Sequence, residues 1–224
     1  TGGEIHHNTA TTSAGMLNAA TKPCVVTIKN IKIHGSEAKS GGALVTQSKA
    51  TLYVEDCEIY DNKTLSGHGG AVFVSSKYSN GYFKNCKFYN NTSAGMGGAV
   101  YASDFSDSSY TNCEFYDNHA TKQGGGLMLY IASTSVLENC TFRNNLADDY
   151  GGGIAVRGNS VMTNVLVENN TSKGNGGGIA TGGAFTYGNL PEHTNGYVGR
   201  GQGLILENTQ VSNNDAVGGG GGVY

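Results

Sequence analysis

The sequence contains no tryptophan and only 2 prolines among 224 residues, although it contains 36 glycines. Glycine at this level, without proline or low-complexity runs, does not indicate disorder, because apolar residues still recur at fixed places. The formal net charge is −3 and both signs are scattered, so nothing indicates a nucleic-acid partner or an anionic membrane. No run of about 18 apolar residues occurs, so we expect no membrane-spanning helix in this segment. No signal peptide is visible, but the chain opens in mid-motif with TGGEIHH, so this absence has little weight.

A repeat of 25 to 29 residues dominates the sequence. Seven copies align on a slot that holds cysteine or a small residue: Ile31, Cys57, Cys86, Cys113, Cys140, Val165 and Thr209. Further apolar slots lie three residues before it, two residues after it, and after a Gly-Gly pair. Short alternations of buried and exposed positions, bounded by asparagine and glycine, are typical of strands, and the apolar residues show no sustained 3.6-residue period. We therefore expect almost no helix.

The repeat unit is too small to bury its apolar side chains alone, whereas stacked units bury them as inward ladders with a rise of about 4.8 Å per coil. This pattern predicts an all-β parallel β-helix of about seven coils, with three short strands per coil, as a single domain over residues 1–224. Leucine-rich repeats need leucine at several fixed offsets, and propeller blades need about 40 residues. Both alternatives fit this sequence less well.

Two polar slots predict the corners of each coil, because asparagine and aspartate tolerate left-handed backbone. One slot precedes the cysteine slot and holds Asn30, Asp56, Asn85, Asn112, Asn139, Asn164 and Asn208. The other follows it by five residues and holds Asn62, Asn91, Asn118, Asn145, Asn170 and Asn214. Stacked asparagines can pass amide hydrogen bonds from coil to coil.

Four cysteines share a slot with Ile31 and Val165, so we interpret them as small, buried, free thiols. The spacing of neighbouring strands is wider than a disulfide prefers. No Cys-x-x-Cys or Cys/His spacing indicates zinc, and the sequence implies neither a metal nor a cofactor. Cys24 lies outside the ladder and has no assigned role.

The segments GGAL (41–44) and GGAV (69–72 and 97–100) resemble the GGA(I/L/V) motif of chlamydial polymorphic membrane proteins. The partner F-x-x-N motif of that family is matched at Phe88–Asn91, Phe115–Asn118 and Phe142–Asn145. The resemblance covers nearly the whole chain. It implies a right-handed β-helix passenger, similar to the pectin-lyase-like fold, that is displayed outside the cell and used in adhesion.

The sequence also contains several N-x-S/T segments, so a glycosylated eukaryotic surface protein remains an alternative. The candidate N-glycosylation sites are Asn62, Asn90, Asn91, Asn139, Asn169 and Asn170.

An enzyme acting on polysaccharide, a lyase or a glycoside hydrolase, is the alternative to a scaffold. Glycoside hydrolysis needs carboxylates about 5 to 10 Å apart across one cleft. The candidate carboxylates are those of Asp148 and Asp149. The His34 segment lies four coils before them, and this order of the two segments does not fit a polygalacturonase. We interpret the Asp pair as a solvated turn and His6–His7 as an exposed loop-edge pair. We assign no catalytic, cofactor-binding or metal-binding residue.

Two rows are candidates for interaction. Three residues after the cysteine slot stand His34, Tyr60, Tyr89, Tyr116 and Arg143, with the tyrosines expected on the outside. A second row, expected to be exposed, includes Phe73, Tyr101 and Met128. Stacked aromatics can bind sugars or a protein partner, or they can simply brace each other along the solenoid.

The number of residues per repeat varies mainly at one corner, which predicts insertion loops at about 7–23 and 181–203. Neither end carries a capping helix, so we expect a piece of a longer β-helix, or a subunit covered by partners. The sequence therefore predicts a non-enzymatic extracellular or cell-surface rod, structural and adhesive, that assembles or displays loops. Its partners would be itself, neighbouring β-helix subunits, or a host or matrix protein or glycan.

Overall fold

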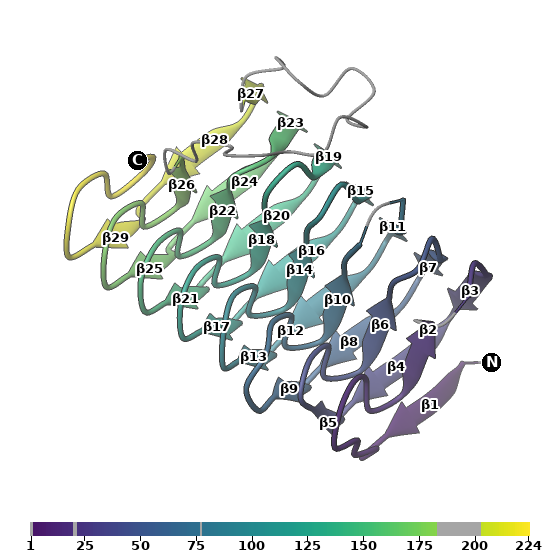
Figure 1. Cartoon of the computed structure of the whole chain (residues 1–224). Helices are drawn as coiled ribbons and strands as arrows, with labels where there is room; N and C mark the ends of the chain where they lie inside the picture. Colours follow the sequence, from purple (N-terminus) through teal and green to yellow (C-terminus); the bar gives the residue numbers. More distant parts are fainter. Residues whose placement is uncertain (1, 20–21, 77, 183–202) are drawn as a thin grey trace, which may run out of the picture.

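The computed structural model describes residues 2–19, 22–76, 78–182 and 203–224. These ranges contain β-strands and no helix, and every strand pairing is parallel. Successive coils stack along one axis, so that the chain's N- and C-terminal ends lie at opposite ends of the stack (Figure 1). This confirms the predicted all-β parallel solenoid of about seven coils.

Four parallel sheets, named A to D here, run the length of the stack. Sheet A contains β1 (Gly3–His6), β4 (Ile31–His34), β8 (Glu58–Tyr60), β12 (Lys87–Tyr89), β16 (Glu114–Tyr116), β20 (Thr141–Arg143), β24 (Leu166–Glu168) and β28 (Gln210–Ser212). Sheet B contains β5 (Glu37–Ala38), β9 (Lys63–Thr64), β13 (Thr92–Ser93), β17 (His119–Ala120), β21 (Leu146–Ala147), β25 (Thr171–Ser172) and β29 (Asp215–Ala216).

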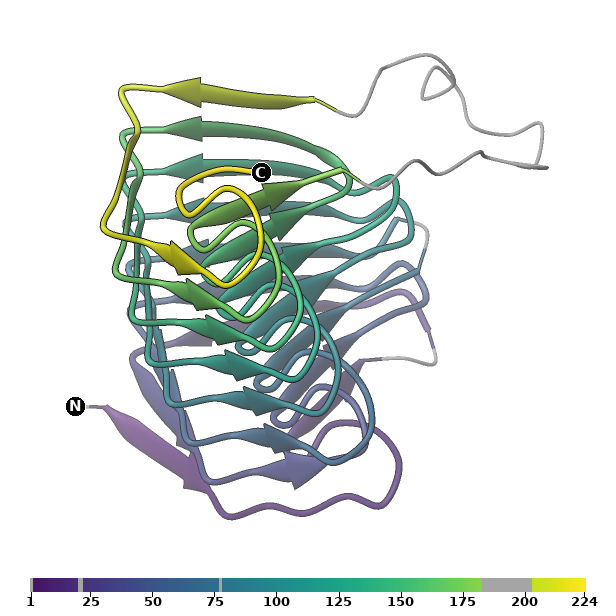
Figure 2. The same cartoon turned by 90° about the vertical axis from the view of Figure 1, so that its left-hand side faces the viewer.

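The other two sheets complete each coil. Sheet C contains β2 (Leu17–Ala19), β6 (Leu44–Thr46), β10 (Val72–Val74), β14 (Val100–Ala102), β18 (Leu127–Leu129), β22 (Ile154–Val156) and β26 (Ile179–Thr181). Sheet D contains β3 (Val25–Lys29), β7 (Thr51–Glu55), β11 (Asn80–Lys84), β15 (Asp107–Thr111), β19 (Thr134–Glu138), β23 (Asn159–Thr163) and β27 (Leu204–Glu207). Figure 2 shows the coils nearly end-on.

Each complete coil therefore has four strands, where the sequence predicted three. The additional strand is the two-residue strand of sheet B, for example β13, which follows β12 after a sharp bend at Asn90 and Asn91. Such a short strand leaves no alternation of its own in the sequence. It is recognisable only from its pairing with the coils on either side.

Left-handed backbone forms the corners. At the first corner, between sheets D and A, all seven predicted residues have a positive φ, from 46° at Asn208 to 55° at Asn30. At the second corner the left-handed residue precedes the predicted asparagine: Asp61, Asn90, Asp117, Asn144, Asn169 and Asn213 have φ between 53° and 56°. Asparagine and aspartate tolerate this region better than other side chains, which explains the first polar slot and the polar residue that precedes each asparagine of the second.

The predicted asparagine row forms a continuous buried ladder. The amide of Asn118 donates to the Asn145 Oδ1 at 3.0 Å and to the carbonyl of Phe88 at 2.9 Å. Its own Oδ1 accepts from the backbone N–H and the amide of Asn91, each at 3.0 Å. The same pattern joins Asn62 to Asn91 and Asn145 to Asn170. The ladder thus satisfies polar groups that the second corner places inside the solenoid.

The core consists of stacked equivalent side chains. The rings of Phe88 and Phe115 stack at a centroid distance of 4.7 Å, and those of Phe115 and Phe142 at 4.5 Å. Both spacings match the distance between neighbouring strands. All these rings are fully buried, so the in-register repeat creates the core directly.

The predicted insertion at 7–23 is wrong for the residues of that segment that the structure describes. Thr9 forms a parallel bridge with Glu37, and β2 pairs in register with β6. This segment is therefore an ordinary part of the first coil, whose divergent sequence hides the repeat. Of the second predicted insertion, residues 183–202 lie outside the described residues.

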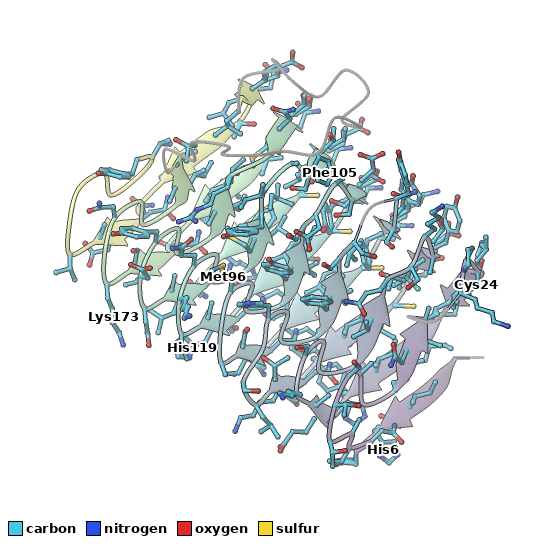
Figure 3. All side chains as sticks on the ribbon, in the orientation of Figure 1. His6, Cys24, Met96, Phe105, His119 and Lys173 are labelled. Atoms are coloured by element: carbon cyan, nitrogen blue, oxygen red, sulfur yellow. The ribbon has the colours of Figure 1, made fainter. Side chains whose placement is uncertain are left out.

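All five cysteines are free, and the four in the ladder are buried, as predicted for those four. The Cys113 thiol faces the carbonyl of Phe83 at 3.5 Å, and the Cys86 thiol faces that of Val54 at the same distance. Cys24 is exposed, at one margin of the N-terminal coils (Figure 3).

This burial predicts a simple thiol count. In the native protein, an aromatic disulfide reagent should label one thiol rapidly, because Cys24 is the exposed cysteine, and all five after unfolding in urea. Cys24→Ser should abolish the rapid phase. Rapid labelling of any thiol in the folded Cys24→Ser protein would contradict the buried cysteine ladder.

Candidate interaction surfaces

A column of stacked rings covers the outer face of sheet A. The centroid distances are 5.2 Å from His6 to His34, 4.6 Å from His34 to Tyr60, 4.7 Å from Tyr60 to Tyr89 and 4.9 Å from Tyr89 to Tyr116. The Arg143 guanidinium lies 4.7 Å from the centre of the Tyr116 ring and ends the column. We call these six residues the aromatic column. The predicted row of tyrosines is thus present, and it extends over six coils.

A row of alternating charges lies beside the column. Lys32 pairs with Glu58 at 3.8 Å, and Lys87 pairs with Glu114 at 3.6 Å. The Tyr89 hydroxyl donates to the Glu58 carboxylate at 3.0 Å. Partial burial, followed by this hydrogen bond, raises the pKa of Tyr89 above the ordinary phenol value, and burial also raises the pKa of Tyr60 and of Tyr116. The column is therefore a half-buried aromatic strip that ends in a guanidinium and is flanked by ion pairs.

The second predicted row is buried, which corrects the expectation that it is exposed. Tyr101 is 6% exposed and Met128 is fully buried, while Phe73 is partly buried against them. The glycine-rich turns fold over the outer face of sheet C and cover this row, as Met96 packs against it and the His68 ring stacks on Tyr101 at 4.7 Å. The row is a second small core, so it is not a candidate surface.

A pair of tyrosines on sheet D was not predicted. Tyr53 and Tyr82 stack on its outer face at a centroid distance of 5.1 Å. Glu55 bridges Lys29 at 2.6 Å and Lys84 at 3.4 Å on the same face. A cavity of about 630 Å³ opens here, lined by Tyr53, Tyr82 and both lysines among others. The sequence contained the signal, because Tyr53 and Tyr82 occupy the same outward slot of consecutive copies.

The candidate glycosylation sites fall into two groups. Asn62, Asn91 and Asn170 are at most 1% exposed, and their amides are hydrogen-bonded within the ladder. A glycan there would require breaking the corner open, so these three positions are not accessible in the folded chain. Asn90, Asn139 and Asn169 are exposed, and of these the Asn139 amide donates to Asn112 at 3.2 Å.

Residues 15–190 match the family model described as the right-handed beta helix region. The chain belongs to this family. No curated protein matched the sequence, and no solved structure matched the chain. Membership in the right-handed β-helix family fixes the architecture, and the narrower resemblance to chlamydial polymorphic membrane proteins is not confirmed by it.

The acidic residues considered for catalysis are engaged with neighbours in this β-helix. Asp148 lies 3.0 Å from His119 Nε2 and 2.8 Å from Lys173 Nζ, and Asp149 accepts from the Gln123 amide at 3.1 Å. Burial opposes the ionisation of Asp148, but the hydrogen bonds and charges of Lys173 and His119 outweigh it and lower the pKa of Asp148. The Asp148–Asp149 turn is therefore partly exposed, and Asp148 in it is ion-paired. Figure 3 shows His119 and Lys173 along the same edge of the solenoid.

The histidines at the N-terminal coils form a compact group. The Nδ1 atoms of His6 and His7 lie 2.7 Å apart, and both residues are exposed as expected. His34 contacts the Glu4 carboxylate at 2.6 Å instead of approaching Asp148. In the part of the chain that the structure describes, no group of three or more His, Cys, Asp or Glu side chains is arranged to hold a metal ion. The same residues include no helix long and apolar enough to cross a membrane.

Proposed function

We propose that this right-handed β-helix is a non-enzymatic structural and adhesive rod of the cell surface or extracellular space, which associates side by side with a second copy through sheet A. The observation that carries the proposal is the aromatic column, an unbroken strip of rings and one guanidinium across six coils. Strips of aromatic side chains with one exposed edge are typical of protein contact surfaces.

The charges beside the column favour a second copy as the partner. The row Glu4, Lys32, Glu58, Lys87 and Glu114 alternates in sign from coil to coil. A copy related by a two-fold axis that passes between two coils would place each lysine opposite a glutamate. Such isologous contacts are the commonest way in which soluble chains pair.

Two further features support a role outside catalysis. Asp148 and Asp149, the carboxylates considered for polysaccharide cleavage, are held by His119, Lys173 and Gln123. The exposed candidates for glycosylation, such as Asn90 and Asn169, suit a protein that passes through a secretory route. A polysaccharide-cleaving turnover that disappeared in Asp148→Asn would overturn this part of the proposal.

Self-association should depend on the column tyrosines. In sedimentation velocity, the wild type should form dimers or larger species with rising concentration. The variant with Tyr60→Ser, Tyr89→Ser and Tyr116→Ser should associate at least tenfold more weakly, because the apolar strip is lost and polar side chains replace it.

The matched control is Tyr78→Ser, which removes an exposed tyrosine away from sheet A. It should associate like the wild type, and far-ultraviolet circular dichroism should show that both variants keep the β fold. A wild-type chain that stays monomeric at high concentration, or a triple variant that associates as strongly as the wild type, would overturn the proposal.

A further inference from the structure

The outward row of tyrosines on sheet D stops abruptly. From coil to coil the paired residues are Thr27, Tyr53, Tyr82, Ser109 and Val136. The Tyr53 and Tyr82 rings stack on each other, and the next position along the stack is only a serine. One face of the Tyr82 ring is therefore directed toward the space above Ser109.

The space above Ser109 has the width of one ring. Tyr82 and Val136 lie on the strands on either side of Ser109, so their side chains are about 9.6 Å apart along the axis, two strand spacings. A ring placed midway would lie about 4.8 Å from the Tyr82 ring, within the usual stacking range. Val136 is 48% exposed and would cover the opposite face. We call this space the Ser109 slot.

Polar side chains border the Ser109 slot on both edges. On one edge Asp107 and Asn80 are register partners, and on the other Thr111 and Lys84 are. All four alternate with buried residues on their strands and so face outward. Partial burial raises the pKa of the Asp107 carboxyl group. The cavity of about 630 Å³ on this face runs from Thr27 past Tyr53 and Tyr82, and it meets the slot at the Lys84–Thr111 edge, while Val136 and Asp107 are not part of its lining.

We propose that the Ser109 slot binds one pyranose ring of a neutral oligosaccharide, with the ring between Tyr82 and Val136 and its hydroxyls directed at the two polar edges. A pyranose has apolar C–H faces and carries hydroxyl groups around its rim, which matches two apolar walls with polar groups on both sides. An aromatic side chain of a partner protein would leave at least one polar edge without hydrogen bonds, at a cost in affinity.

The charges around the slot favour a neutral ligand over an acidic one. Lys84 is already paired with Glu55 at 3.4 Å. The carboxylates of Asp107 and Glu138 stand on β15 and on the following strand, β19. A uronic acid would meet these carboxylates with little positive charge to offset them. The slot is therefore unsuited to acidic polysaccharides.

The test is calorimetric titration of the whole chain with four tetrasaccharides, cellotetraose, maltotetraose, mannotetraose and chitotetraose, and with tetragalacturonate as the acidic probe. At least one neutral tetrasaccharide should bind saturably, and at least tenfold more tightly than tetragalacturonate. Ser109→Tyr should weaken this binding at least tenfold, because the new ring continues the Tyr53–Tyr82 stack and fills the slot.

Two variants separate filling of the slot from other effects. Ser109→Ala keeps the slot open and should retain affinity within about threefold of the wild type, a difference below one hydrogen bond. Thr92→Tyr adds the same ring to β13 on sheet B, away from the slot, and should bind like the wild type. The proposal is overturned if no neutral tetrasaccharide binds, if Ser109→Tyr binds normally, or if tetragalacturonate binds best. The slot lies on sheet D, so none of these results depends on self-association through sheet A.

Discussion

Replacing Asn118 by leucine should lower the free energy of unfolding by about 4 kcal/mol, although the two side chains have nearly the same size. Asn118 is 1% exposed. Its loss would leave the carbonyl of Phe88, the backbone N–H of Asn91 and one amide hydrogen of Asn91 without their partners inside the solenoid. Each orphaned buried group costs about 1–3 kcal/mol. A loss of this size is a large fraction of the stability of an ordinary domain.

The comparison variant is Asn112→Leu, which makes the same chemical change at the outer corner of the same coil. Asn112 is exposed and has a φ of 53°, so its replacement should cost about 1–2 kcal/mol through left-handed strain. Urea unfolding followed by far-ultraviolet circular dichroism measures both variants. Equal losses at the two positions would show that the buried ladder contributes no more than the corner conformation does.

The sequence was sufficient to predict the solenoid because each ladder is formed by one equivalent residue from every coil. Every coil repeats the same inward slot, so that the stacking of Phe88 on Phe115 and the hydrogen bond of Asn118 to Asn145 follow from alignment alone. The two asparagine rows identified both corners. The position of the left-handed residue at the second corner, Asn90 before Asn91, was not visible because both positions are polar.

The surfaces were harder to predict, because alternation along a strand separates core-facing from outward residues but does not show what covers the outward ones. Tyr101 and Met128 point away from the main core and are nevertheless buried, since the glycine-rich turns cover sheet C. Among the residues that the structure describes, no comparable turn covers the column on sheet A or the Tyr53–Tyr82 pair on sheet D. Whether a turn folds back over its own strand depends on its backbone path, which the repeat pattern does not encode.

The same turns explain why glycine is so abundant. Gly97 has a φ of 68°, and the following Gly98 passes so close to the next coil that a Cβ atom added there would overlap the carbonyl oxygen of Gly125. The backbone of His119 would lie within 3 Å on another side. The Gly-Gly pair thus permits close contact between neighbouring coils, while Ala99 in the next position is tolerated and buried.

Gly98→Ala should therefore destabilise the fold by about 3 kcal/mol or more, because the added methyl group meets backbone atoms that cannot move without separating the coils. The control is Gly222→Ala, which changes the last copy of the motif at the position equivalent to Ala99. Its added Cβ would meet only the Val211 side chain, at 3.6 Å, an ordinary contact. Gly222→Ala should leave the urea midpoint nearly unchanged, while Gly98→Ala lowers it clearly. If Gly98→Ala unfolded at the wild-type midpoint, the close approach of neighbouring coils at the glycine turn would be wrong.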